Sequence, residues 1–262
     1  MQAARVAWYA LTRLPYPLLA ASAVGWMLLT VAESVPSLPA LCVSPATANE
    51  VIVRFSAVFT VTAPGTVLLA STVMLLAMMP PLLGPPLLHV WRRSLPRRRV
   101  RAVALFVLGY ALVWLAAELV LVSGWLLLGN FAPAAGPVPF AIAALIALTW
   151  QATPLKQISL NRCHGRPPLA AFGLRAEADA LRYGASHGLW CVGACWALML
   201  LPLAANGPPH WIAMLGVMLI SAVERVRAPQ AARWGAAWPR SPLPHNGAPA
   251  GYTASFIAVK KS

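Results

Sequence analysis

Long runs of apolar residues alternate with short polar segments along the chain. A helix needs about 20 mainly apolar residues to cross the hydrocarbon core of a membrane. Six runs approach this length, roughly over residues 15–35, 54–79, 101–128, 137–153, 187–205 and 208–224. The pattern therefore predicts an all-α, polytopic transmembrane helix bundle with about six spans.

Turn residues and a change in composition suggest how the chain is organised. Only Asn206-Gly207-Pro208-Pro209 separates the last two apolar runs, which predicts a tight reversal and a helical hairpin. From about residue 233 the sequence becomes rich in proline and glycine. We expect one transmembrane helical domain over residues 1–232 and a flexible cytoplasmic tail over residues 233–262.

The composition agrees with a membrane environment. Of 262 residues, 60% are hydrophobic and 10% are charged, and the mean hydropathy is +0.70. These values predict a multi-pass protein of the cell membrane, in contact with the lipid bilayer. The net charge of +14 could indicate a nucleic-acid partner, but the basic residues lie between apolar runs and form no aromatic-basic binding module. We therefore expect no nucleic acid to bind.

The basic residues predict an orientation, because cytoplasmic loops carry an excess of lysine and arginine. The segment WRRSLPRRRVR over residues 91–101 contains six arginines, and residues 154–186 contain one lysine and four arginines. Both segments are expected to be cytoplasmic. With six spans, the N-terminus and the C-terminus then also lie in the cytoplasm, where both are basic.

Two cysteines four residues apart interrupt the apolar run GLWCVGACWALML. Residues with this spacing lie about 6 Å apart on one face of a helix, a separation that a thiophilic metal can bridge. We expect Cys191 and Cys195 in the first turns of the fifth helix, near its cytoplasmic end. Cys163, in the preceding loop, can fold back on them, whereas Cys42 is expected on the outer side. Small cysteines can equally serve only to pack a helix.

Other chemically distinctive side chains are expected at the same cytoplasmic level. Met79 ends the second helix, His187 begins the fifth, and Met199 follows Cys195 in the same run, so these three are further candidate metal ligands. Each also has a simpler interpretation, because methionine commonly fills apolar cores and a boundary histidine is commonly solvated. Lys156 is expected to be a headgroup anchor, and Glu224 to pair with Lys156, Arg225 or Arg227.

Glu118 lies within the apolar run WLAAELVLV. A carboxylate inside a bilayer costs at least a few kcal/mol unless it is protonated or paired. Glu118 is therefore expected to face the bundle interior. It is either a neutral acid that bonds to a neighbouring helix or part of a proton or cation relay.

Several short motifs, taken in order, resemble the family called domain of unknown function 2182. They are AMMPP at 77–81, GYALVW at 109–114, QATPLKQISLNRCHGRP at 151–167, GLWCVGACWALML at 188–200 and SAVERV at 221–226. The resemblance covers residues 70 to 235 approximately. It implies a metal-binding integral membrane protein, but it implies no particular reaction.

The chain departs from the pattern of that family at two positions. Ser159 and Ala194 stand where the resemblance leads us to expect further cysteines. The site is then either degenerate or reduced to three thiols. Three soft sulfur ligands suit a copper ion in the Cu(I) state, which we favour. A zinc ion would take a fourth ligand from His164 or His187.

The sequence thus predicts a protein that binds a soft metal near its cytoplasmic face and acts in transport, chaperoning or assembly. One alternative is an accessory or structural subunit of a larger membrane complex. A second is a membrane thiol oxidoreductase that cycles a disulfide between Cys163 and a helical cysteine. No nucleophile with its base and no nucleotide-binding motif is present, so catalysis is not the first expectation. The oligomeric state is left open.

Overall fold

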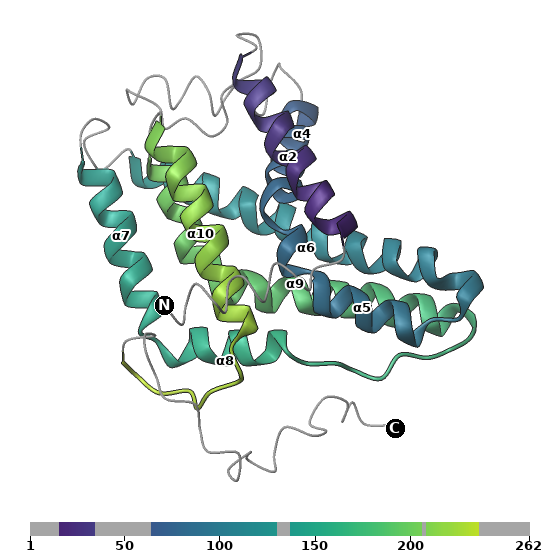
Figure 1. Cartoon of the computed structure of the whole chain (residues 1–262). Coiled ribbons are helices and arrows are strands. Elements are labelled where there is room, and N and C mark those ends of the chain that lie inside the picture. The colour runs from purple at the N-terminus through teal and green to yellow at the C-terminus, as the bar shows by residue number, and fades with distance from the viewer. Residues whose placement is uncertain (1–15, 35–63, 130–136, 206–207, 236–262) are drawn as a thin grey trace.

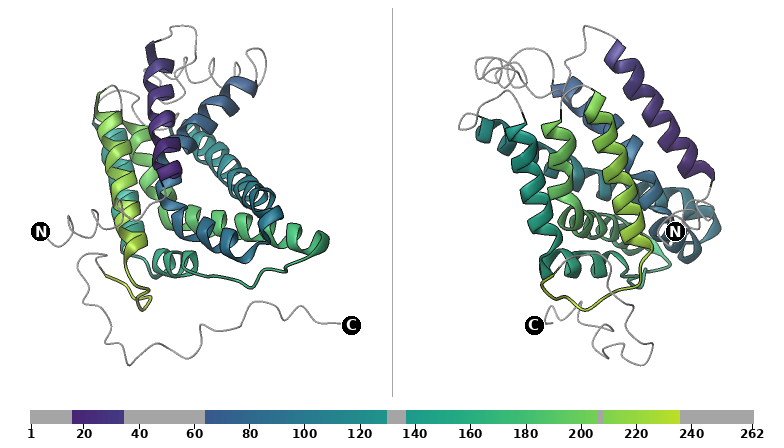
Figure 2. Two further views of the ribbon diagram at one scale, coloured as in Figure 1. Left: turned by 45° about the vertical axis from the view of Figure 1, so that its right-hand side comes forward. Right: turned by 60° about the vertical axis from the view of Figure 1, so that its left-hand side comes forward.

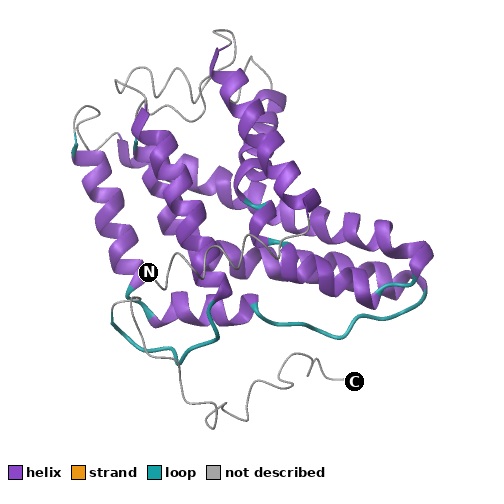
Figure 3. Ribbon diagram, viewed as in Figure 1, coloured by secondary structure: helices purple, strands orange, loops and turns teal. Residues whose placement is uncertain are grey.

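The computed structural model describes residues 16–34, 64–129, 137–205 and 208–235. Throughout these ranges the chain forms helices and loops, without a strand (Figure 3). The predicted all-α class is therefore confirmed for this part of the chain. Cys42, the N-terminal segment and the tail beyond residue 235 lie outside the described residues, so the predictions about them stay predictions.

The helices follow one another with short connections. Their bounds are α2 Tyr16–Ser34, α4 Pro64–Met78, α5 Gly84–Arg93, α6 Arg99–Gly129, α7 Val138–Gln151, α8 Pro154–Cys163, α9 Gly173–Ala204 and α10 Pro208–Val226. Two single 3-10 turns, η1 Pro80–Leu82 and η2 Pro96–Arg98, precede α5 and α6. Proline starts both turns, because its fixed backbone angle suits the first position of a helix and cannot continue one.

Helix α9 forms the centre of the fold (Figure 1). Helix α6 packs along it, while α7, α8 and α10 contact it from other sides. Helix α2 pairs with α4 in a separate layer, and α5 lies against α6 (Figure 2). Four helices therefore meet α9, so its side chains are the best placed to form a shared site.

The contact between α6 and α9 depends on small residues and aromatic rings. A Cβ added at Gly184 would overlap the backbone carbonyl of Phe106, so only glycine permits this approach. The rings of Phe106 and Tyr183 lie 5.1 Å apart between centroids. Tyr110 follows Phe106 at the helical spacing of four residues, and its ring lies 6.1 Å from that of His187. This aromatic layer aligns α6 with the part of α9 that carries the cysteines.

Three helices are long and apolar enough to cross a membrane: Pro96–Trp125, Gly173–Ala204 and Pro209–Val226. A fourth span is possible if α7 and α8, which meet at an angle of 71°, form one broken segment. Helix α2 is also apolar but shorter. The described residues thus provide three or four candidate spans, and the six spans and their orientation stay predictions.

The structure corrects the expected loop over residues 154–186. This stretch contains α8 and the first turns of α9, so Cys191, Cys195 and His187 lie well inside a 32-residue helix rather than at its start. Hydropathy missed the helix because its first half is charged. Those charges are satisfied locally: Glu177 pairs with Arg101 at 2.9 Å, and Asp179 accepts a hydrogen bond from the backbone N–H of Ala170 at 3.0 Å.

Candidate metal site

Three of the four cysteines come together between α8 and α9. Cys163 is the last residue of α8, and Cys191 and Cys195 lie one turn apart on α9. Their exposed fractions are 8%, 0% and 3%, and all three are free thiols. The Sγ of Cys195 donates a hydrogen bond to the carbonyl of Cys191 at 3.1 Å. Cys163 lies within electrostatic range of both other sulfurs, so the three thiols lie in one region of the protein, while their role as metal ligands stays a prediction.

Two aromatic side chains of α6 border the Cys191 sulfur. The hydroxyl of Tyr110 lies 3.2 Å from this Sγ, and either atom can donate the hydrogen bond. Trp114, one turn further along, is buried in the same core as Cys191, and its indole N–H has no hydrogen-bond partner in the described part of the chain. These donor groups would stabilise negative charge on the Cys191 sulfur when the thiol loses its proton.

Arg225 of α10 is the third neighbour of the thiols. Its Nη1 donates to Nε2 of His187 at 3.1 Å, and its backbone carbonyl lies 3.0 Å from Nε2 of His164. The guanidinium is within electrostatic range of the sulfurs of Cys163, Cys191 and Cys195. A cation is thus built into the cluster.

The two histidines that were considered as zinc ligands are engaged elsewhere. Nε2 of His187 faces the Arg225 guanidinium. Both ring nitrogens of His164 lie at hydrogen-bond distance from carbonyl oxygens, those of Leu160 and Arg225, at 2.9 and 3.0 Å. Neither imidazole directs an available lone pair at the thiols. Within the described ranges no group of three or more His, Cys, Asp or Glu residues is arranged to hold a metal ion.

The remaining donors are soft sulfurs, and they suit one metal better than another. Cu(I) accepts two or three sulfur ligands, whereas zinc prefers four ligands in a tetrahedron. By their chemistry, three thiols without an available imidazole therefore suit Cu(I) better than zinc.

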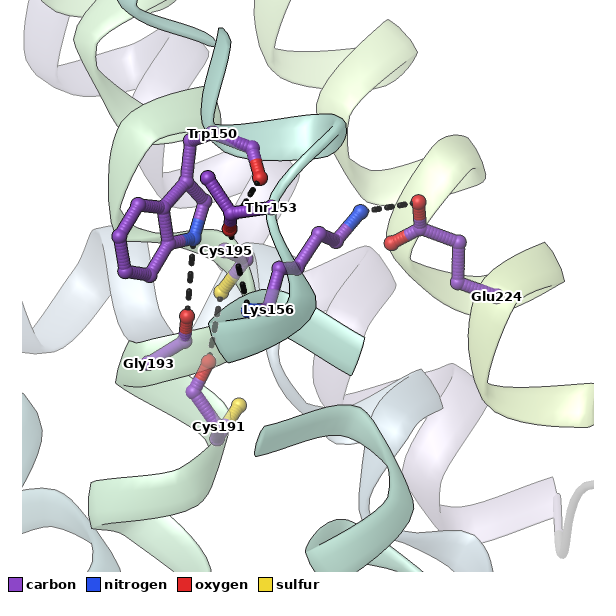
Figure 4. Close-up of polar contacts among 7 residues, drawn as sticks. All are labelled: Trp150, Thr153, Lys156, Cys191, Gly193, Cys195 and Glu224. Atoms are coloured by element: carbon purple, nitrogen blue, oxygen red, sulfur yellow. Dashed lines mark hydrogen bonds and ion pairs between the residues drawn. The ribbon is translucent and has the colours of Figure 1, made fainter. Parts of the chain in front are cut away.

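A buried ion pair fixes α8 beside this cluster (Figure 4). The Nζ of Lys156 bonds to Oε1 of Glu224 on α10, and the two side chains are only 4% and 8% exposed. Lys156 is therefore not the headgroup anchor that we expected, whereas the predicted pairing of Glu224 with Lys156 is confirmed. Burial of this pair holds α8, and with it Cys163, in place.

The start of α8 is also capped and tied to α9 (Figure 4). The Oγ1 of Thr153 accepts a hydrogen bond from the backbone N–H of Lys156 at 3.3 Å and donates one to the Trp150 carbonyl at 2.8 Å. The indole N–H of Trp150 donates to the carbonyl of Gly193 at 3.0 Å. An N-cap threonine satisfies an otherwise unpaired N–H of the first turn. These contacts fix the bend between α7 and α8 against the cysteine-bearing part of α9.

The other predicted residues lie near the cluster without joining it. Met79 and Met199 are buried in the hydrophobic core that contains Cys191 and Cys195, which also suits their interpretation as core residues. Glu118 is half-buried on α6 and interacts with Ser71 of α4. Its Oε2 has no hydrogen-bond partner within the described ranges. The structure thus points Glu118 toward α4, while its relay role stays a prediction.

Sequence reasoning missed Tyr110, Trp114 and Arg225. The first two were visible in GYALVW, since residues four apart share a helical face. Arg225 was considered only as a topological charge and as a possible partner of Glu224. No local pattern marks an arginine that turns inward toward residues more than 30 positions away.

Comparison of the sequence with known protein families agrees with the prediction that the protein handles a soft metal. No curated protein and no solved structure matches the chain. Residues 68–239 match the family model PpoB2, described as copper chaperone, and this range includes every residue of the thiol cluster. The match agrees with the predicted preference for copper, and it does not test the resemblance to domain of unknown function 2182. Because the match covers well over half of the sequence, the chain belongs to the PpoB2 family of copper chaperones.

Proposed function

We propose that this protein is an integral membrane copper chaperone that holds Cu(I) as cargo on the thiols of Cys163, Cys191 and Cys195. The observation that carries the proposal is the convergence of three buried, free thiols from α8 and α9. The family description supplies the metal, and the absence of an available imidazole at the cluster favours Cu(I) over zinc.

Binding of Cu(I) to the cysteines is a simple exchange of protons for the metal ion. Two thiols bind one Cu(I) and release two protons, which gives a complex with one negative charge. The third thiol can complete a trigonal site or take over one bond while another is broken. A set of three sulfurs therefore suits a carrier that must hold a metal and also release it.

The setting of the site is also part of the proposal. We propose that the protein is a multi-pass protein of the cell membrane, with six spans and both termini in the cytoplasm. The thiols then lie on the cytoplasmic side of the apolar part of α9, whose charged first turns extend beyond the membrane, and a membrane protein complex receives the copper. The long apolar helices and the arginine distribution support this arrangement.

The test is anaerobic loading of the detergent-purified protein with Cu(I), followed by metal analysis. We expect about one copper per chain, since two or three sulfurs complete one Cu(I) site. Cys191→Ser and Cys195→Ser should each remove most of the bound metal, and Cys163→Ser should weaken its retention. Cys42→Ser is the matched control and should bind as the wild type does. A wild-type protein without copper, or serine variants that retain it in full, would refute the proposal.

The thiol oxidoreductase alternative has its own readout in the same preparation. A disulfide between Cys163 and a helical cysteine would make the number of reactive thiols rise after treatment with reductant. The copper proposal expects equal numbers before and after reduction in the metal-free, anaerobically prepared protein.

A further inference from the structure

Arg225 lacks a carboxylate partner in the part of the chain that the structure describes. Ion pairs in this part of the chain join Arg101 to Glu177 and Lys156 to Glu224. The carboxylate next to Arg225 in sequence is thus committed to another cation. A half-buried guanidinium in an apolar bundle nevertheless needs an anionic neighbour, because an isolated buried charge is costly.

The geometry directs Arg225 to the thiol cluster from two sides. Its Nη1 bonds to His187, which precedes Cys191 by one turn on the same face of α9. Its carbonyl bonds to His164, which directly follows Cys163. Arg225 is therefore bracketed between the two elements that supply the sulfurs, and its guanidinium interacts electrostatically with all three.

The charge of the loaded site explains why a cation belongs there. Binding follows 2 RSH + Cu⁺ → [Cu(SR)₂]⁻ + 2 H⁺, so copper is neither oxidised nor reduced and the product carries one negative charge. An anion in a water-poor bundle is unfavourable unless a charge of opposite sign lies close to it. A guanidinium suits this task, since it stays positively charged and is more weakly hydrated than an ammonium group.

We propose that Arg225 is the counter-cation of the copper-thiolate complex, a positioning residue that stabilises the anionic loaded state without ligating the metal. This inference rests on the proposed function. It follows that Arg225 influences which metal ion the site prefers. The site favours a monovalent soft ion, because the bis-thiolate complex of such an ion is anionic. The competing interpretation is that Arg225 occupies the place of the metal and must be displaced by it.

The test compares Cu(I) affinities of the full-length protein in detergent, measured by competition with a chromophoric Cu(I) chelator. We expect Arg225→Gln to weaken Cu(I) binding by at least about tenfold, which corresponds to the loss of one charge-assisted contact. Arg225→Lys should restore most of the affinity, because it returns the charge. Arg227→Gln, two residues further along, is the matched control and should bind Cu(I) as the wild type does.

Binding of a second metal distinguishes an electrostatic role of Arg225 from a structural one. Hg(II) forms a neutral bis-thiolate complex, so it has no need of a counter-cation. We expect Arg225→Gln to take up Hg(II) with the wild-type stoichiometry while its Cu(I) affinity falls. Equal losses for both metals would indicate a merely structural role. Should Arg225→Gln fail to fold, Arg225→Met, which fills similar space without a polar group, provides the same comparison.

The outcomes also distinguish this inference from the proposed function. A wild-type protein that binds no Cu(I) would overturn both. A wild-type protein that binds Cu(I), together with an Arg225→Gln variant that binds it equally well or more tightly, would overturn only the counter-cation. Tighter binding would specifically support the displaced-cation interpretation.

Discussion

The ion pair between Lys156 and Glu224 allows a quantitative test of how α8 is held. Both side chains are almost fully buried, so removal of one partner leaves the other charge without compensation. Breaking such a pair costs about 3–5 kcal/mol, whereas replacing both partners with apolar groups of similar size is often nearly neutral. We therefore expect Lys156→Met and Glu224→Leu each to destabilise the protein by about 3 kcal/mol or more, and the double variant to recover most of this loss.

The assay is reversible denaturation in detergent, followed by the fluorescence of the tryptophans in a double-mutant cycle. The matched control is the exposed pair of Arg101 and Glu177, whose side chains are 66% and 19% exposed. Glu177→Gln should cost less than about 1 kcal/mol, because solvent screens an exposed pair. A coupling energy near zero for Lys156 and Glu224 would refute the reasoning. So would a cost for Glu177→Gln equal to that for Glu224→Leu.

Three further outcomes follow from single positions. Gly184→Ala should lower the stability by about 1–3 kcal/mol, because its Cβ has no room beside the α6 backbone; thermal melting against Gly124→Ala, where the space is open, checks this. Glu118→Gln should leave the melting temperature nearly unchanged, because an amide replaces a carboxyl group that is expected to be uncharged; a collapse of the fold would show that the charged form is structural. Ala194→Cys should tighten Cu(I) binding in the competition assay, and an unchanged affinity would count against a fourth thiol position beside Cys195.

Hydropathy predicted the helices that are apolar along their whole length, but not those that combine apolar and charged turns. Hydropathy missed the first half of α9 because this half is charged. Its acidic side chains find partners on α6 and in the preceding loop, and the helix forms despite the charge. Helix α5 was missed because it is short and carries arginines at its end. Local patterns report the polarity of a segment, whereas these charges are stabilised by partners that only the fold brings close.

The candidate site divides in the same way. The spacing of Cys191 and Cys195 placed both on one face of a helix. Cys163 was expected to fold back on them from a loop, whereas the structure brings it there as the last residue of α8, which packs against α9. The roles of Tyr110 and Arg225 depend on how α6 and α10 pack against α9, and no spacing within either helix encodes that packing. The sequence therefore predicted that the three cysteines lie near one another, but not which polar groups surround them.

The adjacent residues Glu224 and Arg225 offer a last test, because they face different neighbours. Consecutive helical residues point about 100° apart, so Glu224 reaches Lys156 of α8 while Arg225 reaches His187 of α9. We expect Glu224→Gln to lower the free energy of unfolding while the folded fraction keeps its Cu(I) affinity within about threefold, since the variant removes no positive charge from the thiols and leaves Lys156 within electrostatic range of Cys195. Arg225→Lys should preserve both the free energy of unfolding and the Cu(I) affinity, because it keeps the positive charge. If Glu224→Gln weakens Cu(I) binding as strongly as Arg225→Gln does, the two residues act as one unit, and the separation between holding α8 and compensating the complex is wrong.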